Sequence, residues 1–186
     1  MKTVERKITI KARLAAIHPA RQRGSSLLEG IAYLGVAAVI ILGALSLLRG
    51  AFGSVQSNQT TTELASIRTA VQKLYMGQGG YGTASMVANL GAAHAFPASV
   101  RVASDFSSAA NSWGGAVTVT GATNNFKISY AAVPQNVCVE TVGGADGWTQ
   151  ISNGTTTVSL SGAPASPDQA STLCNASTNN LTFTSI

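Results

Sequence analysis

The sequence predicts an α+β fold in which a long N-terminal helix packs on an antiparallel β-sheet. Three observations support this prediction. An uncharged, apolar stretch covers residues 30–48, and apolar residues then recur at helical spacing as far as residue 74. From residue 113 onward, apolar and polar residues alternate, which is typical of strands with one buried face. A helical region followed by a run of strands is typical of α+β folds.

The chain begins with a strongly basic segment. Seven of the 12 Lys and Arg residues, but only one of the seven acidic residues, fall within residues 1–24. The segment therefore carries a net charge of +6, while the rest of the chain, with five basic and six acidic residues, carries −1. A nucleic-acid-binding domain spreads its basic residues over a folded face, so the distribution argues against a nucleic-acid partner.

The stretch from Gly30 to Leu48 has the length and composition of a membrane span. A helix rises about 1.5 Å per residue, so roughly 20 apolar residues cross the hydrocarbon core. Because the positive charge precedes this stretch, we expect the N-terminus to stay in the cytoplasm. A cleaved secretory signal is the alternative, but the stretch exceeds the usual apolar core of about 7–15 residues.

Glu29 lies at the edge of this stretch, where an unpaired carboxylate is costly and an acid is a functional hypothesis by default. The alternative is an acid that lies in the headgroup zone.

The residues Arg23-Gly24-Ser25-Ser26-Leu27-Leu28-Glu29, followed by the apolar stretch, resemble the processing site of type IV prepilins. If the chain is cut after Gly24, as in that family, the removed leader is long and the mature protein begins with Ser25. Both features resemble the type IVb branch, in particular the major pilins of conjugative-plasmid thin pili and related enteric adhesive pili.

The resemblance implies that a membrane prepilin peptidase cuts between Gly24 and Ser25 and methylates the new terminus at Ser25. It implies three regions: a cleaved basic leader (1–24), a hydrophobic transmembrane and assembly half of the helix (25–53), and a periplasmic globular pilin domain (54–186). Cleavage would create an α-amine one helical turn from Glu29, on the same face. The ammonium and the carboxylate of Glu29 could neutralise each other within one chain or between neighbouring subunits. A pairing between subunits would set their axial register, as a lone polar group does in a coiled coil.

The helix is expected to run from about Ser26 to Met76. Its second half carries one apolar stripe, typical of packing on a sheet. The stripe consists of Leu64, Ile67, Val71 and Leu74. Residues Thr60–Glu63 resemble a capping box, which leaves open whether a new helix begins there or the helix continues. The glycines of 43–53 predict a kink or local melting, and the Gly-rich residues 77–82 predict the end of the helix.

Strands are expected in the remaining chain, after a connection over 77–105 in which a short helix over 83–90 is one option. Alternating residues predict a hairpin of 117–120 and 126–130. Further strands are expected at 137–139, 148–151, 155–160 and 181–185, and a proline-containing loop at 161–171. The segments 111–117, 126–130 and 133–138 are similar to the globular domain of type IVb pilins, and the last 45 residues match less clearly.

Cys138 and Cys174 are the only cysteines of the chain. They follow the apolar helix and should face an oxidising compartment, where disulfides persist. We predict a disulfide between them, which would stabilise the fold by roughly 4 kcal/mol. A metal pair or a catalytic thiol is the alternative, but no Cys-x-x-Cys or neighbouring His supports a zinc site. The resemblance adds a C-terminal disulfide loop that is exposed on the filament.

Signals for an enzyme are weak. Outside the basic leader, His94 is the only histidine, and no acid lies within ten positions of it. The sequence contains no Gly-x-Ser-x-Gly nucleophile elbow, and its acids are too scattered to suggest a carboxylate pair or a metal loop. We therefore predict no catalytic residue, no cofactor and no metal.

These observations favour a major pilin, a structural subunit that leaves an inner-membrane reservoir for an extracellular filament serving conjugation, adhesion or aggregation. The resemblance implies further copies of this chain, the prepilin peptidase, an assembly ATPase with its platform protein and secretin, and a host or recipient cell surface as partners. A minor pilin or pseudopilin of a secretion or priming complex is the first alternative. A membrane-anchored periplasmic binding module or enzyme is the second.

Overall fold

The computed structural model describes residues 27–186. They belong to two compact units, the first ending at Gly43 and the second covering Ala44–Ile186. Helix α1 (Leu27–Leu74) extends through both units, which confirms the prediction of one long helix. The residues from Gly43 to Gly53 are helical, so the local melting expected there is absent, while the kink stays a prediction.

Helix α1 continues through the threonine run at 60–62. The Oγ1 atoms of Thr60, Thr61 and Thr62 donate to the carbonyls four residues earlier, at 2.8, 3.0 and 2.8 Å. These bonds follow the helix and do not begin a new one, because a capping hydroxyl would accept from a backbone N–H instead. Of the two alternatives left open for this run, the continuing helix is therefore correct.

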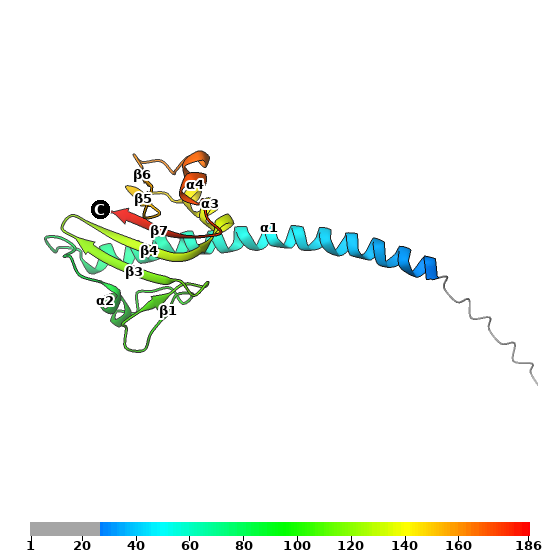
Figure 1. The fold of residues 1–186 in the computed structure, drawn as a ribbon. Coiled ribbons are helices and arrows are strands. Elements are labelled where there is room, and N and C mark those ends of the chain that lie inside the picture. Colours follow the sequence, from blue (N-terminus) through cyan, green and yellow to red (C-terminus); the bar gives the residue numbers. More distant parts are fainter. Residues whose placement is uncertain (1–26) are drawn as a thin grey trace, which may run out of the picture. The chain divides into compact units, whose positions relative to one another are not determined.

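The second half of α1 packs on the sheet through the expected stripe. Leu64, Ile67 and Val71 are completely or almost completely buried, whereas Leu74 remains 39% exposed. Figure 1 shows this part of the helix against one face of the strands. Polar residues on the earlier turns are buried as well, namely Ser57, Thr60 and Glu63. The buried face of α1 therefore changes from polar to apolar along the chain.

Within residues 27–186, seven strands form one sheet of antiparallel pairs, in the order β1-β2-β3-β4-β7-β5-β6. They are β1 (Arg101–Val102), β2 (Ala109–Ala110), β3 (Ala116–Ala122), β4 (Asn125–Pro134), β5 (Gln150–Ser152), β6 (Thr157–Ser159) and β7 (Thr178–Ser185). The last strand in sequence, β7, lies between β4 and β5 (Figure 1). The end of the chain is therefore part of the centre of the sheet.

The predicted hairpin is confirmed as β3 and β4. Val117 pairs with Tyr130, and the pairing continues to Ala122 and Asn125. The expected strands left residues 121–125 for the turn, but only residues 123–124 connect β3 and β4 in the structure. Val117, Phe126 and Tyr130 are among the residues whose side chains alternate into the core. The alternation of apolar and polar residues in the sequence thus indicates which face of each strand is buried.

The strand expected at residues 137–139 is wrong, because these residues belong to helix α3 (Gln135–Gly144). The buried residues of this helix are Val137, Cys138, Thr141 and Val142. Their spacing of three and four positions is helical, but the sequence Val-Cys-Val alone cannot distinguish a short strand from a buried helical turn. Pro134 at the N-cap ends β4 and helps to separate the two elements.

The loop expected at residues 161–171 is also wrong in part, because residues 167–173 form helix α4 (Pro167–Leu173). Ser166 and Gln169 form a capping box: the Gln169 N–H donates to Ser166 Oγ at 3.3 Å, and the Ser166 N–H donates to Gln169 Oε1 at 2.9 Å. Pro167 occupies the first turn, where its missing N–H costs nothing. This Ser-Pro-Asp-Gln signature was present in the sequence and was missed.

The remaining elements differ mainly in their boundaries. Helix α2 (Val87–Ala92) begins later than the short helix considered at 83–90. Strands β5 and β6 confirm the two strands expected in this region, in shorter form, and β7 begins three residues earlier than expected. Strands β1 and β2 were not expected, because each contains only two residues and shows no alternation.

Candidate assembly site

The first half of α1 exposes a continuous apolar surface. An 18-residue window of this helix has a mean hydropathy of 2.5, and 0% of it is buried. The side chains concerned include Leu27, Leu28, Ile31, Leu34, Val36, Val39, Ile40, Ile41 and Leu42. By length and composition, the helix could cross a membrane. A surface of this size needs lipid or other apolar helices around it, because exposed apolar area of this extent marks an interaction site.

Glu29 lies in the first turn of α1, and its side chain is exposed. One helical turn later, Tyr33 donates its hydroxyl to Oε1 of Glu29 at a long distance of 3.5 Å. The predicted cleavage residues Gly24 and Ser25 lie outside the described residues. Processing at Gly24, methylation at Ser25 and the pairing of its amine with Glu29 therefore stay predictions.

The predicted disulfide is present: Cys138 of α3 is bonded to Cys174, which directly follows α4, with a Cα–Cα distance of 5.8 Å. Both cysteines are buried. The metal pair and the catalytic thiol considered as alternatives are wrong, since each sulfur is used in the bond. The bridge fixes the C-terminal end of one short helix to another.

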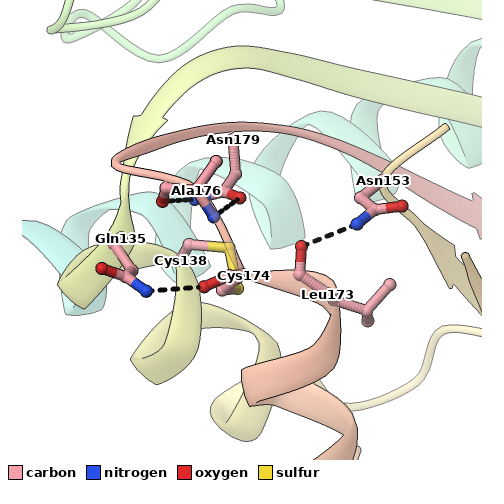
Figure 2. Close-up of a disulfide and its surroundings, with 7 residues drawn as sticks. All are labelled: Gln135, Cys138, Asn153, Leu173, Cys174, Ala176 and Asn179. Atoms are coloured by element: carbon pink, nitrogen blue, oxygen red, sulfur yellow. Dashed lines mark hydrogen bonds between the residues drawn. A yellow bond between two sulfur atoms is a disulfide. The ribbon is translucent and has the colours of Figure 1, made fainter. Parts of the chain in front are cut away.

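Two amide side chains hold the same end of α4 (Figure 2). Gln135 donates from Nε2 to the Cys174 carbonyl, and Asn153 donates from Nδ2 to the Leu173 carbonyl, both at 3.0 Å. The last carbonyls of a helix have no partner within it, so these donors satisfy groups that would otherwise be free. The disulfide therefore works together with side-chain caps from α3 and from the β5–β6 turn.

Two side chains of α3 lie close to α1 at Gly53. A Cβ atom at this position would lie 2.6 Å from Nδ2 of Asn136 and 4.0 Å from Oε1 of Glu140. Gly53 thus leaves room for the Asn136 side chain beside α1, and a larger residue at this position would require that flexible side chain to move.

A buried carboxylate joins α1 to the sheet. Glu63 is only 4% exposed and accepts two hydrogen bonds: from Tyr130 Oη to Oε2 at 3.2 Å and from Gln59 Nε2 to Oε1 at 2.9 Å. Burial, together with the neighbouring charge of Glu63, raises the pKa of Tyr130 above its ordinary value near 10. Sequence reasoning missed this pair, although Glu63 directly precedes Leu64 on the buried stripe.

His94, the one candidate for enzyme chemistry, lies in an exposed turn with a left-handed backbone (φ 49°). Its ring stands edge-on to Phe106, with 6.3 Å between ring centroids. In the described part of the chain, no group of three or more His, Cys, Asp or Glu residues could hold a metal ion. The geometry of His94 is that of a residue packed on an aromatic side chain.

Comparisons with known proteins agree with this architecture. A family model described as PilS N terminal matches residues 54–186. The crystal structure of a type IVb pilin from Salmonella typhi is 28% identical, with a TM-score of 0.56 over 68% of this chain and 97% of that chain. The structure of TcpA, a type IV pilin from Vibrio cholerae El Tor biotype, is 14% identical and shows the same fold, with a TM-score of 0.52 over 70% and 99% of the two chains. No curated protein matches the sequence.

Proposed function

We propose that this chain, which belongs to the PilS family of type IV pilins, is the major structural subunit of a type IVb pilus. Pilins are structural proteins and not enzymes, so the expectation of a chain without catalytic function agrees with its family. The observation that supports the subunit role is the exposed apolar half of α1 joined to a pilin domain in one continuous helix. A membrane-anchored enzyme or binding module would need an apolar anchor but not a helix that continues from the anchor into the core of its domain.

In this proposal the chain is a precursor. Prepilin peptidase removes the basic leader 1–24 by cutting between Gly24 and Ser25, and it methylates the new N-terminus. The mature protein then waits in the inner membrane, with 25–53 as its transmembrane and assembly segment and 54–186 as its periplasmic domain. Later, it becomes part of an extracellular filament that serves conjugation, adhesion or aggregation.

Assembly exchanges lipid for other copies of the same helix. The apolar side chains of 27–48 leave hydrocarbon for apolar neighbours, so the exchange has a small net cost and depends on close packing. Glu29 supplies the polar element, because its carboxylate receives the Ser25 amine of the next subunit. The partners are thus other copies of the chain, together with the peptidase, the assembly ATPase, the platform protein and the secretin.

The test is the intact mass, measured without reductant, of the protein sheared from cells. We expect a species that begins at Ser25, is heavier by one methyl group and is lighter by the two hydrogens of the Cys138–Cys174 bridge. It should be abundant in a filament pellet. A chain that retains its leader, or one cut inside the apolar stretch, would contradict processing. A correctly processed but scarce species would instead indicate a minor pilin or pseudopilin.

A further inference from the structure

The contact between Tyr33 and Glu29 brings together two of the few polar groups in the apolar half of α1. Between Gly30 and Leu48, the only polar side chains are those of Tyr33 and Ser46. Helical side chains tilt toward the N-terminus, so the phenol of Tyr33 reaches back over the preceding turn, where Glu29 lies. The Oη atom of Tyr33 is 3.5 Å from Oε1 of Glu29.

We infer that Tyr33 is a positioning residue for Glu29. Its hydroxyl binds one carboxylate oxygen, Oε1, and no other residue of 27–186 bonds to the carboxylate, so that Oε2 can receive the α-amine of the next subunit. The inference rests on the proposed function, in which Glu29 accepts that amine. In addition, Tyr33 orients the Glu29 carboxylate toward that amine.

The membrane-embedded subunit needs such a partner before assembly. A carboxylate at the edge of the hydrocarbon core is costly without a donor, and a hydrogen bond from its own helix reduces that cost. Tyrosine suits this depth, because its ring is at home at the membrane interface while its hydroxyl reaches a polar group. Since the bond is long at 3.5 Å, we expect it to contribute orientation more than strength.

A spectroscopic experiment tests the contact itself. The processed chain has three glutamates, Glu29, Glu63 and Glu140. Carbon-13 labelling of their side-chain carboxyls, in nanodiscs of phosphatidylethanolamine and phosphatidylglycerol, gives three signals, and Glu29→Ala identifies the one from Glu29. We expect Tyr33→Phe to move this signal and to leave the other two in place. Ser46→Ala, which removes a hydroxyl elsewhere in the same helix, should move none of them.

A second experiment tests the consequence for assembly. Cells express wild-type and variant subunits together, and the intact mass of sheared filaments gives the share of each. Tyr33→Phe and Ser46→Ala both remove one oxygen atom, so they are matched in mass. Because the bond is long, we expect Tyr33→Phe subunits to enter filaments roughly twofold to threefold less often than wild type, the size expected for a weak hydrogen bond. Ser46→Ala subunits should enter like wild type.

The outcomes separate this inference from the proposed function. If Glu29→Ala subunits enter filaments as readily as wild type, the register role of Glu29 fails, and positioning by Tyr33 fails with it. If Glu29→Ala is excluded while Tyr33→Phe enters like Ser46→Ala, only the positioning inference is overturned. An unchanged Glu29 signal in Tyr33→Phe overturns it as well, even when fewer of these subunits enter filaments.

Discussion

Single polar side chains connect distant parts of this domain. Glu63 on α1 and Tyr130 on β4 are far apart in sequence, and their hydrogen bond spans the interface between helix and sheet. A buried acceptor that loses its donor costs about 1–3 kcal/mol, more when it is charged. The pair therefore stabilises one arrangement of α1 on the sheet and penalises others.

Replacing Tyr130 with Phe tests this pair. The folded-state pKa of Tyr130 is raised above the unfolded value near 10, so its stabilisation is complete below pH 10 and is lost as the pH rises further. We expect Tyr130→Phe to cost about 1–3 kcal/mol at pH 7, because Glu63 loses a donor. We also expect a smaller loss of stability between pH 9 and about pH 11 than in wild type.

Chemical denaturation of the disulfide-bonded protein at several pH values measures both effects. Tyr75→Phe is the matched control, because Tyr75 is half-buried and its hydroxyl accepts a long hydrogen bond from Asn89, at 3.4 Å. This control should behave like wild type. An alkaline stability profile of Tyr130→Phe that matches wild type would contradict the assignment.

Asn111 explains the structural role of segment 111–117, whose sequence resembles that of type IVb pilins. Its side chain is fully buried; Oδ1 accepts from the N–H groups of Trp113 and Gly115, and Nδ2 donates to the Ala131 carbonyl at 2.7 Å. A Cβ atom on Gly115 would collide with the same carbonyl. The motif is therefore a structural one that fastens a turn to β4 beside its bulge.

Among the elements, the short helices α3 and α4 form a pair of their own. Their link consists of the disulfide and the caps from Gln135 and Asn153 at the end of α4. Neither helix is long enough to be stable alone, because isolated helices shorter than about 12–15 residues are marginal. They persist because their buried sides pack together and on the sheet.

Ser166→Ala tests the start of α4. The substitution removes the Ser166 Oγ that accepts from the Gln169 N–H, and we expect a loss of about 0.5–2 kcal/mol in unfolding free energy. Thermal or denaturant unfolding measures it. Ser171→Ala, at an exposed position within the same helix, should change stability little. Equal effects of the two variants would indicate that the capping box contributes nothing.

Removing the bridge tests how α4 is held. The double variant Cys138→Ala/Cys174→Ala should lose about 2–5 kcal/mol of stability, because the 36-residue separation leaves a long loop free in the unfolded chain. Because the caps from Gln135 and Asn153 remain, α4 should stay docked, with slow hydrogen exchange of its backbone amides. Fast exchange of these amides in an otherwise folded domain would mean that the disulfide alone holds the helix.

For the whole molecule, the difference between the exposed apolar half of α1 and the globular residues 54–186 leads to a prediction about solubility. Residues 54–186 retain the stripe of Leu64, Ile67 and Val71, the sheet and the disulfide. We expect this fragment, exported to an oxidising compartment, to form a soluble, disulfide-bonded monomer. Size-exclusion chromatography checks this expectation. The fragment 25–186 should instead require detergent, and aggregation of the shorter fragment would contradict the separation.

The sequence by itself determined the features that depend on neighbouring residues. The long helix α1, the β3–β4 hairpin and the apolar surface of 27–48 all follow from periodicities of a few residues. The disulfide followed from there being only two cysteines and from the compartment they face. Even α4 was encoded locally, by the capping box at Ser166.

Only the tertiary structure decided what depends on distant segments. It placed β7 between β4 and β5, turned residues 137–139 into part of α3, and brought Tyr130 to Glu63. A short apolar run fits a strand or a helix equally well, so the surrounding core selects one of them. Strand order and buried hydrogen bonds arise in the same way, because their free energy comes from groups that meet only when the whole domain packs.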